Sequence, residues 1–168
     1  MDGSNNEIIK LFRETNANIF EEQISICNKL NEYNANICIN IVAHKGNLND
    51  IYNLTNVLNN LPYIKKWQIF QYSPIGKFGK LNKKSFEITE EEFLAYKSEI
   101  LKNYKYNKNK IEFKSSISRD KTYMLIDNSG YAWISLFDPT MNNKKYIGNI
   151  LNPNDWDKII YNLKNKVR

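Results

Sequence analysis

Two segments of the chain have the residue pattern of strands in a parallel sheet, and amphipathic stretches surround them. Residues 35–42 are largely apolar on both faces, and residues 66–72 form the next run of strand-forming side chains. Apolar residues return at three- and four-residue spacing over 16–33 and 51–61, which predicts helices. Thr89, with a glutamate three residues later, predicts a capping box at the start of another helix. Helices and strands that alternate in this way predict parallel strands with right-handed crossovers.

The C-terminal part of the chain predicts a small antiparallel region. Residues 127–130 have the composition of a hairpin turn, and short apolar segments lie on both sides of them. The other expected elements are a strand at 111–113, an extended segment at 147–151 and a short helix from about Asn154. We therefore separate residues 1–110, which hold the parallel strands, from a C-terminal extension at 111–168.

The number of strands limits the fold. Only two segments carry a strong parallel-strand pattern, which is too few for a doubly wound sheet or a complete barrel. The chain also begins with loop-like residues directly before a helix, with no strand ahead of them. The expected fold class is therefore α/β: a partial TIM-type barrel, about half of one, with parallel strands and a small antiparallel extension. In such a barrel, ligands bind where the strands end.

Composition limits the chemistry that the chain can perform. A length of 168 residues with 42% hydrophobic residues suits one globular domain, and no apolar run is long enough to cross a bilayer. The excess of 24 Lys and Arg over 18 Asp and Glu favours anionic ligands, but it is mild for a dedicated nucleic-acid binder. A single histidine argues against multi-histidine catalysis. Because no signal peptide is visible and two cysteines form no disulfide framework, we expect a cytoplasmic location.

Five segments share their residues and their order with one enzyme family. They are Asp2-Gly3-Ser4 with Arg13, 39–42 followed by Lys45 and Asn47, 66–71, 86–93 and 115–127. The first is similar to the Ser-x-Asp-Gly strand end of radical S-adenosylmethionine (SAM) enzymes, in which an arginine follows. The second resembles their fifth barrel strand and its exit. Residues 66–71 resemble the Arg-Trp-Lys-Val-Phe-Gln strand of the viperin-like branch. The chain therefore resembles the C-terminal part of a viperin-like radical SAM domain.

The resemblance implies reductive cleavage of S-adenosylmethionine by a [4Fe–4S] cluster, followed by hydrogen abstraction from a substrate. The family's C-x-x-x-C-x-x-C motif is absent, because Cys27 and Cys38 are the only cysteines and ten residues separate them. A cubane cluster of this kind needs three cysteines. We therefore expect the C-terminal portion of an enzyme that is inactive alone. It is either split from an N-terminal partner that carries the cluster or truncated.

Four residues are candidates for ligand binding, and each has a plainer alternative. By the resemblance, Arg13 pairs with the cofactor's carboxylate; the alternative is a helix-surface arginine. Asn40 interrupts an apolar strand, which predicts a buried amide that binds the cofactor in the lumen or else bonds to neighbouring backbone. A further alternative is that it only reflects the general abundance of Asn in this sequence. Lys45 and Lys66 would hold an anionic small-molecule substrate, or are solvated surface lysines. His44 would transfer a proton, or is structural.

A second class of function stays open beside the enzyme. The chain would then be a non-catalytic binding module of the same fold, which docks a partner through an exposed strand edge. Nucleic-acid binding through the lysines of 77–84 and 102–110 ranks last, because few aromatic residues accompany them. Residues 73–76 are expected to open a long loop that stays basic through Lys84. These four residues either pass over the site or simply form a turn after a strand.

Overall fold

The computed structural model describes residues 1–14, 17–74, 76–118, 124–135 and 144–166. The chain divides into two compact units. The first consists of Met1–Tyr72 and Asn82–Ser115, and the second of Ser73–Leu81 and Ser116–Arg168. Among the residues described, no helix combines the length and the apolar character that a membrane span requires.

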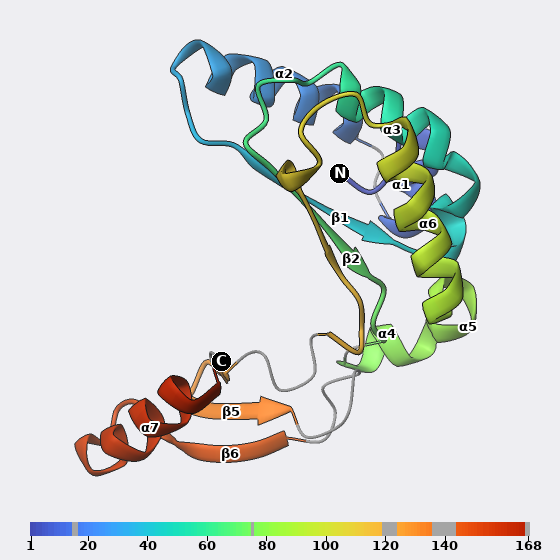
Figure 1. Ribbon diagram of the computed structural model, residues 1–168. Helices are drawn as coiled ribbons and strands as arrows, with labels where there is room; N and C mark the ends of the chain where they lie inside the picture. The colour runs from blue at the N-terminus through green and yellow to red at the C-terminus, as the bar shows by residue number, and fades with distance from the viewer. Residues whose placement is uncertain (15–16, 75, 119–123, 136–143, 167–168) are drawn as a thin grey trace. The chain divides into compact units, whose positions relative to one another are not determined.

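The first unit is built on a parallel sheet of three strands in the order β1-β2-β3 (Figure 1). The strands are β1 (Cys38–Ala43), β2 (Lys66–Gln71) and β3 (Ile111–Lys114). The helices are α1 (Asn6–Phe12), α2 (Ile19–Glu32), α3 (Ile51–Asn59), α5 (Lys83–Phe86) and α6 (Glu90–Asn103), with 3₁₀ turns η1 (Lys45–Asp50) and η2 (Lys108–Lys110). Strand and helix alternate along this unit, so the predicted parallel pairing of the first two strands is confirmed.

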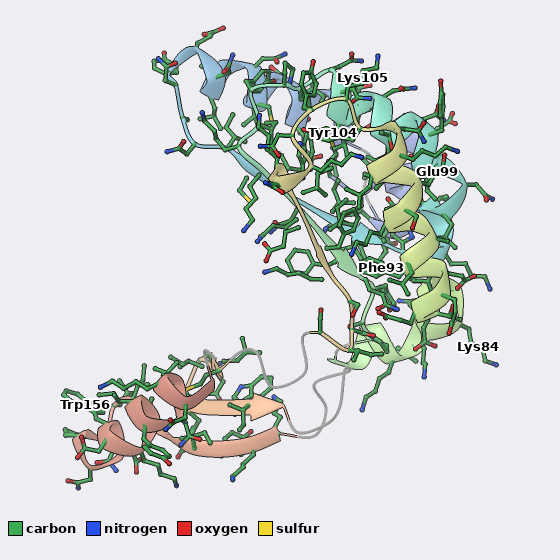
Figure 2. The ribbon with its side chains drawn as sticks, viewed as in Figure 1. Lys84, Phe93, Glu99, Tyr104, Lys105 and Trp156 are labelled. Atoms are coloured by element: carbon green, nitrogen blue, oxygen red, sulfur yellow. The ribbon has the colours of Figure 1, made fainter. Side chains whose placement is uncertain are left out.

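The core of this unit lies between the sheet and its helices. Ile41, Trp67 and Ile69 point from the sheet toward the helices and are fully buried. They pack with apolar residues of α3 and α6, which are Leu54, Leu58, Phe93, Tyr96 and Ile100. Figure 2 labels Phe93 on α6, whose ring meets the ring of Phe113 at 6.3 Å. The three- and four-residue spacing of these side chains is what gives each helix a single buried face.

The predicted capping box is confirmed at the start of α6. The Thr89 hydroxyl accepts a hydrogen bond from the Glu92 amide at 3.1 Å, and the Glu92 carboxylate accepts one from the Thr89 amide at 2.8 Å. These two bonds satisfy donors that the first turn of a helix would otherwise leave open. The helix therefore begins where the sequence pattern places it.

The second unit is a three-stranded antiparallel sheet with one helix packed on it. Its strands are β4 (Met124–Ile126), β5 (Tyr131–Ser135) and β6 (Lys144–Asn149), and its helices are α4 (Gly76–Leu81), η3 (Pro153–Asp155) and α7 (Trp156–Lys166). Ile159 of α7 joins Ala132, Ile134 and Ile147 in the core. Gly130 has a φ of 82°, which glycine adopts without strain, and this closes the predicted hairpin between β4 and β5.

The expected half barrel is wrong. Within the described ranges of the chain, the parallel sheet has three strands, and the C-terminal strands form a separate antiparallel sheet. The hairpin turn folds β4 back onto β5, so these strands satisfy each other's backbone and do not extend the parallel sheet. The strand expected at 111–113 is β3, and it pairs in parallel with β2.

Some local expectations were also wrong. Residues 76–81 and 83–86 form short helices instead of a continuous basic loop. The sequence pattern did not predict α1, because a helix of 7 residues is too short to show a clear apolar period.

Candidate functional site

One face of the parallel sheet carries polar and charged side chains, and we call it the open face. Its residues are Cys38, Asn40, Val42, Lys66, Gln68, Phe70, Glu112 and Lys114, each at least partly exposed. The core helices of the first unit pack against the opposite face of the sheet. Parallel sheets are usually covered on both faces and therefore apolar on both. A polar face on such a sheet indicates a surface that meets water or a polar ligand.

The strand register places these side chains in rows across the open face. Asn40 pairs with Gln68, and Gln68 pairs with Glu112. In the next row, Val42 pairs with Phe70. Side chains opposite each other on adjacent strands lie close enough to interact. The row Asn40–Gln68–Glu112 therefore places two amide side chains and a carboxylate side by side across the three strands.

Glu112 is the centre of the charge network on this face. Its carboxylate accepts hydrogen bonds from Lys66 Nζ at 2.6 Å and from Gln68 Nε2 at 2.7 Å, and Lys114 Nζ lies 3.6 Å away. The hydrogen bonds from Lys66 and Gln68 lower the pKa of Glu112 below its ordinary value, and the charges of Lys114 and Lys66 add to this effect. Lys114 also lies over the ring of Phe70, with 5.4 Å between Nζ and the ring centroid. The network holds Lys66 on the open face.

A cavity of about 400 Å³ lies at the outer edge of β1 and brings together the two candidate cofactor ligands. Its lining includes both Arg13 and Asn40. The rest of the lining consists of Met1, Gln23, Ile26, Cys27, Leu30, Ile37, Cys38 and Ile39. The cavity is therefore mostly apolar, with one cationic and one amide side chain among its walls.

Arg13 already has a carboxylate partner within the chain. Its Nε and Nη2 lie 2.8 and 2.7 Å from Asp2 Oδ2. The other carboxylate oxygen of Asp2 accepts a hydrogen bond from the Val42 amide of β1 at 2.9 Å. Asp2 is 2% exposed, whereas the Arg13 side chain is 54% exposed, so the guanidinium still faces solvent. Asp2 thus fixes Arg13 beside the end of β1.

Asn47 connects the start of the chain, the end of β1 and the turn that follows it. Its Nδ2 donates to the Asp2 carbonyl at 2.9 Å and to the Val42 carbonyl at 2.8 Å. Its Oδ1 accepts a hydrogen bond from the His44 amide at 2.9 Å. The side chain is fully buried. The bonds to the Asp2 carbonyl and the His44 amide are buried, and the bond to the Val42 carbonyl is partly buried. Asn47 therefore supplies partners where solvent has little access.

His44 is buried and holds the η1 turn. Its Nδ1 accepts a hydrogen bond from the Gly46 amide at 3.1 Å. The ring stacks on Phe12 at 4.4 Å and meets the edge of Phe86 at 5.5 Å. Burial lowers the pKa of His44 from 6.5 to about 4, although the negative charge of Asp2 opposes this shift. A neutral, fully buried ring of this kind is structural, which is one of the two roles considered for His44, so the geometry does not support proton transfer.

The other candidates lie in different places. Lys66 lies on the open face, and Lys45 is exposed at the start of η1, just after the end of β1. Asn40 is exposed, so the burial expected of its amide is wrong: its side of β1 faces away from the helices. The sequence reasoning missed Gln68 and Glu112. Their alternation with the apolar neighbours Trp67 and Phe113 was the available signal.

The described residues offer no ligand set for an iron–sulfur cluster. Cys27 is buried, and burial raises the pKa of its thiol, whereas Cys38 is exposed at the start of β1. No group of three or more His, Cys, Asp or Glu side chains within the described part of the chain is placed to hold a metal ion. The implied [4Fe–4S] cluster therefore does not fit the residues of this chain.

The sequence was compared with family models and with curated proteins, and neither comparison identified a relative. No family model matches the sequence, and a search of curated proteins found no match either. Inferences about function therefore rest on the residues of the open face, on the cavity beside β1 and on the sequence resemblance.

Proposed function

We propose that this chain supplies cofactor- and substrate-facing strands to a radical SAM enzyme of the viperin-like type. The cluster would be bound by cysteines that this sequence does not contain, carried by a partner chain with the C-x-x-x-C-x-x-C motif. Five ordered segments of resemblance motivate the family, and the polar row Asn40–Gln68–Glu112 on a parallel sheet is the observation that carries the proposal. A cytoplasmic location belongs to the same proposal, because reduced thiols and iron–sulfur chemistry suit a reducing compartment.

The structure supports different roles for the candidate residues. Asn40 is exposed on β1 and lines the 400 Å³ cavity, so its amide is available to donate to and accept from a polar ligand. Arg13 lines the same cavity and keeps donors available beyond those that Asp2 takes. Lys66, held beside Glu112, would meet an anionic substrate on the open face. Lys45 remains a candidate for substrate binding through its place after the end of β1.

The first test measures binding of S-adenosylmethionine to the purified chain by calorimetry. We expect Asn40→Ala to weaken binding about tenfold, because one hydrogen bond to a charged ligand contributes roughly 1.5 kcal/mol. Asn31→Ala is the matched control, since Asn31 is exposed on α2 and does not line the cavity. Failure to bind at millimolar cofactor, or equal binding by the Asn40 variant, would contradict the proposed role.

The second test asks where the cluster is held. The chain is incubated with ferrous iron and sulfide under anaerobic conditions, desalted, and examined by visible absorption. We expect no retained iron–sulfur chromophore, because the two thiols fall short of the three that the cluster needs. A [4Fe–4S] cluster that stays on the isolated chain would show that the ligands do not come from a partner.

A further inference from the structure

The outer edge of β1 has two parts, and only one of them is occupied. In a parallel ladder, alternate residues direct both backbone groups to the same neighbour. The Ile37 carbonyl accepts hydrogen bonds from the amides of Lys65 and Lys66, and the Ala43 carbonyl accepts one from the Tyr72 amide. The odd-numbered residues of this strand therefore direct their backbone groups toward β2, and the even-numbered residues direct theirs away from it. The backbone groups of Cys38, Asn40 and Val42 therefore face outward.

The start of the chain occupies the second half of this edge. The Met1 nitrogen donates to the Asn40 carbonyl at 2.8 Å. The Asp2 carboxylate accepts a hydrogen bond from the Val42 amide, and the Asn47 side chain donates one to the Val42 carbonyl. Closer to the start of β1, the amide and carbonyl of Cys38 and the amide of Asn40 have no hydrogen-bond partner among the residues that the structure describes. We call this part the free edge.

The free edge lies beside the 400 Å³ cavity. Ile26 and Leu30 of α2 form part of its apolar wall and are 59% and 41% exposed. Arg13 is the one charged side chain among the lining residues. Three unpaired backbone groups in strand geometry, an apolar hollow and a guanidinium thus lie together. Unpaired strand edges of this kind pair with extended peptide segments.

From this juxtaposition we infer that the free edge of β1 is a docking site for an extended segment of a partner polypeptide. The segment adds to the sheet beside Cys38 and Asn40, places one apolar side chain in the cavity and carries an acidic residue toward Arg13. The segment and S-adenosylmethionine would use the same cavity and the same Arg13, so they would compete for it. The inference does not depend on the proposed function, because a chain that never binds S-adenosylmethionine would present the same edge.

A second copy of this chain fits the free edge poorly. If two β1 strands paired in an antiparallel manner, residues 35–37 of one copy would continue along the other copy toward Val42. Met1 and Asp2 already occupy that position through their bonds to Asn40 and Val42. A segment that pairs with the edge through only two or three of its residues and then turns away does not meet this obstacle.

Amide hydrogen exchange, followed by NMR, tests the edge directly. In the free protein, we expect the amides of Ile39 and Ile41 to exchange slowly and those of Cys38 and Asn40 to exchange quickly. The probe is the acetylated and amidated peptide Thr-Val-Leu-Val-Glu-Thr. At saturation it should slow exchange at Cys38 and Asn40 at least tenfold. Slow exchange at these amides without peptide, or protection by the peptide elsewhere only, would overturn the inference.

Two pairs of variants test the contacts separately. Cys38→Pro removes the outward amide and should weaken peptide binding at least tenfold, while Cys38→Ser keeps the backbone and should bind as the unchanged protein does. Leu30→Lys places a charge at the cavity wall and should also weaken binding. Tyr33→Lys is the control and should not weaken it, because Tyr33 is exposed and lies outside the cavity lining.

The outcomes remain decisive if a variant fails to fold, because the exchange pattern of the unchanged protein stands alone. Equal peptide binding by folded Cys38→Pro and Cys38→Ser would overturn the inference. So would protection of Cys38 and Asn40 that grows with protein concentration without peptide, since it would assign the edge to a second copy. Binding of S-adenosylmethionine is measured separately, so failure of the docking site is distinguishable from failure of the proposed enzyme function.

Discussion

Replacement of Asn47 by alanine is expected to lower the free energy of unfolding by about 3 kcal/mol, because it removes the partners of two buried backbone groups and one partly buried group. The groups left without partners are the Asp2 carbonyl, the Val42 carbonyl and the His44 amide. Each buried polar group that loses its partner costs roughly 1–3 kcal/mol, and local rearrangement toward water recovers part of this. The variant therefore loses a large fraction of the stability of a domain of this size.

Urea unfolding followed by circular dichroism measures this loss. Asn49→Ala is the matched control, because Asn49 is exposed in the same turn. We expect the control to stay within about 0.5 kcal/mol of the unchanged protein. Similar losses in the two variants would show that the turn, and not the hydrogen bonds of Asn47, determines the effect.

Stability is expected to fall by about 2 kcal/mol between pH 7.5 and pH 5, because His44 must stay neutral in the folded protein. Its pKa is about 4 when folded and 6.5 when unfolded. Between these values the unfolded state binds more protons, so the free energy of unfolding decreases as the pH falls. The contribution is fully present above pH 6.5, is lost as the pH falls toward 4, and changes no further below that.

His44→Asn separates this effect from all other titrations. Asparagine is a favourable residue before a helical turn and does not titrate, and the variant keeps every other ionisable group. Because the sequence contains no other histidine, the difference between the two pH profiles belongs to His44. We expect the variant to be less stable at pH 7.5, since it loses the stacking on Phe12, and its profile to be flatter between pH 5 and 7.5. Equal slopes would contradict the assignment.

Periodicity predicted the elements of the first unit better than their assembly. The three- and four-residue spacing of apolar residues over 51–61 predicted a helix, and α3 forms there with Leu54 and Leu58 buried. The capping box at Thr89 and the hairpin before Tyr131 were also visible, because each depends on residues that are neighbours in sequence. These features are local, so a single sequence contains the information that determines them.

The barrel and the site depended on long-range pairing. Whether a strand joins an existing sheet or starts a new one is decided by contacts between distant residues, which periodicity does not encode. The same holds for Asn40, whose exposure follows from the side of β1 that the helices leave uncovered. Asp2 and Asn47 were not predicted as partners, since 45 positions separate them and only the fold brings them together.

The order of the strands in the parallel sheet is also their order in the chain. During synthesis, β1 and β2 can therefore pair before β3 has left the ribosome, and the sheet grows by one strand at a time. The second unit forms a local hairpin between neighbouring strands, whereas β2 and β3 pair Trp67 with Ile111, which a long intervening segment separates in the sequence. Contacts between distant residues form slowly, so completion of the parallel sheet by β3 should set the pace at which the first unit folds.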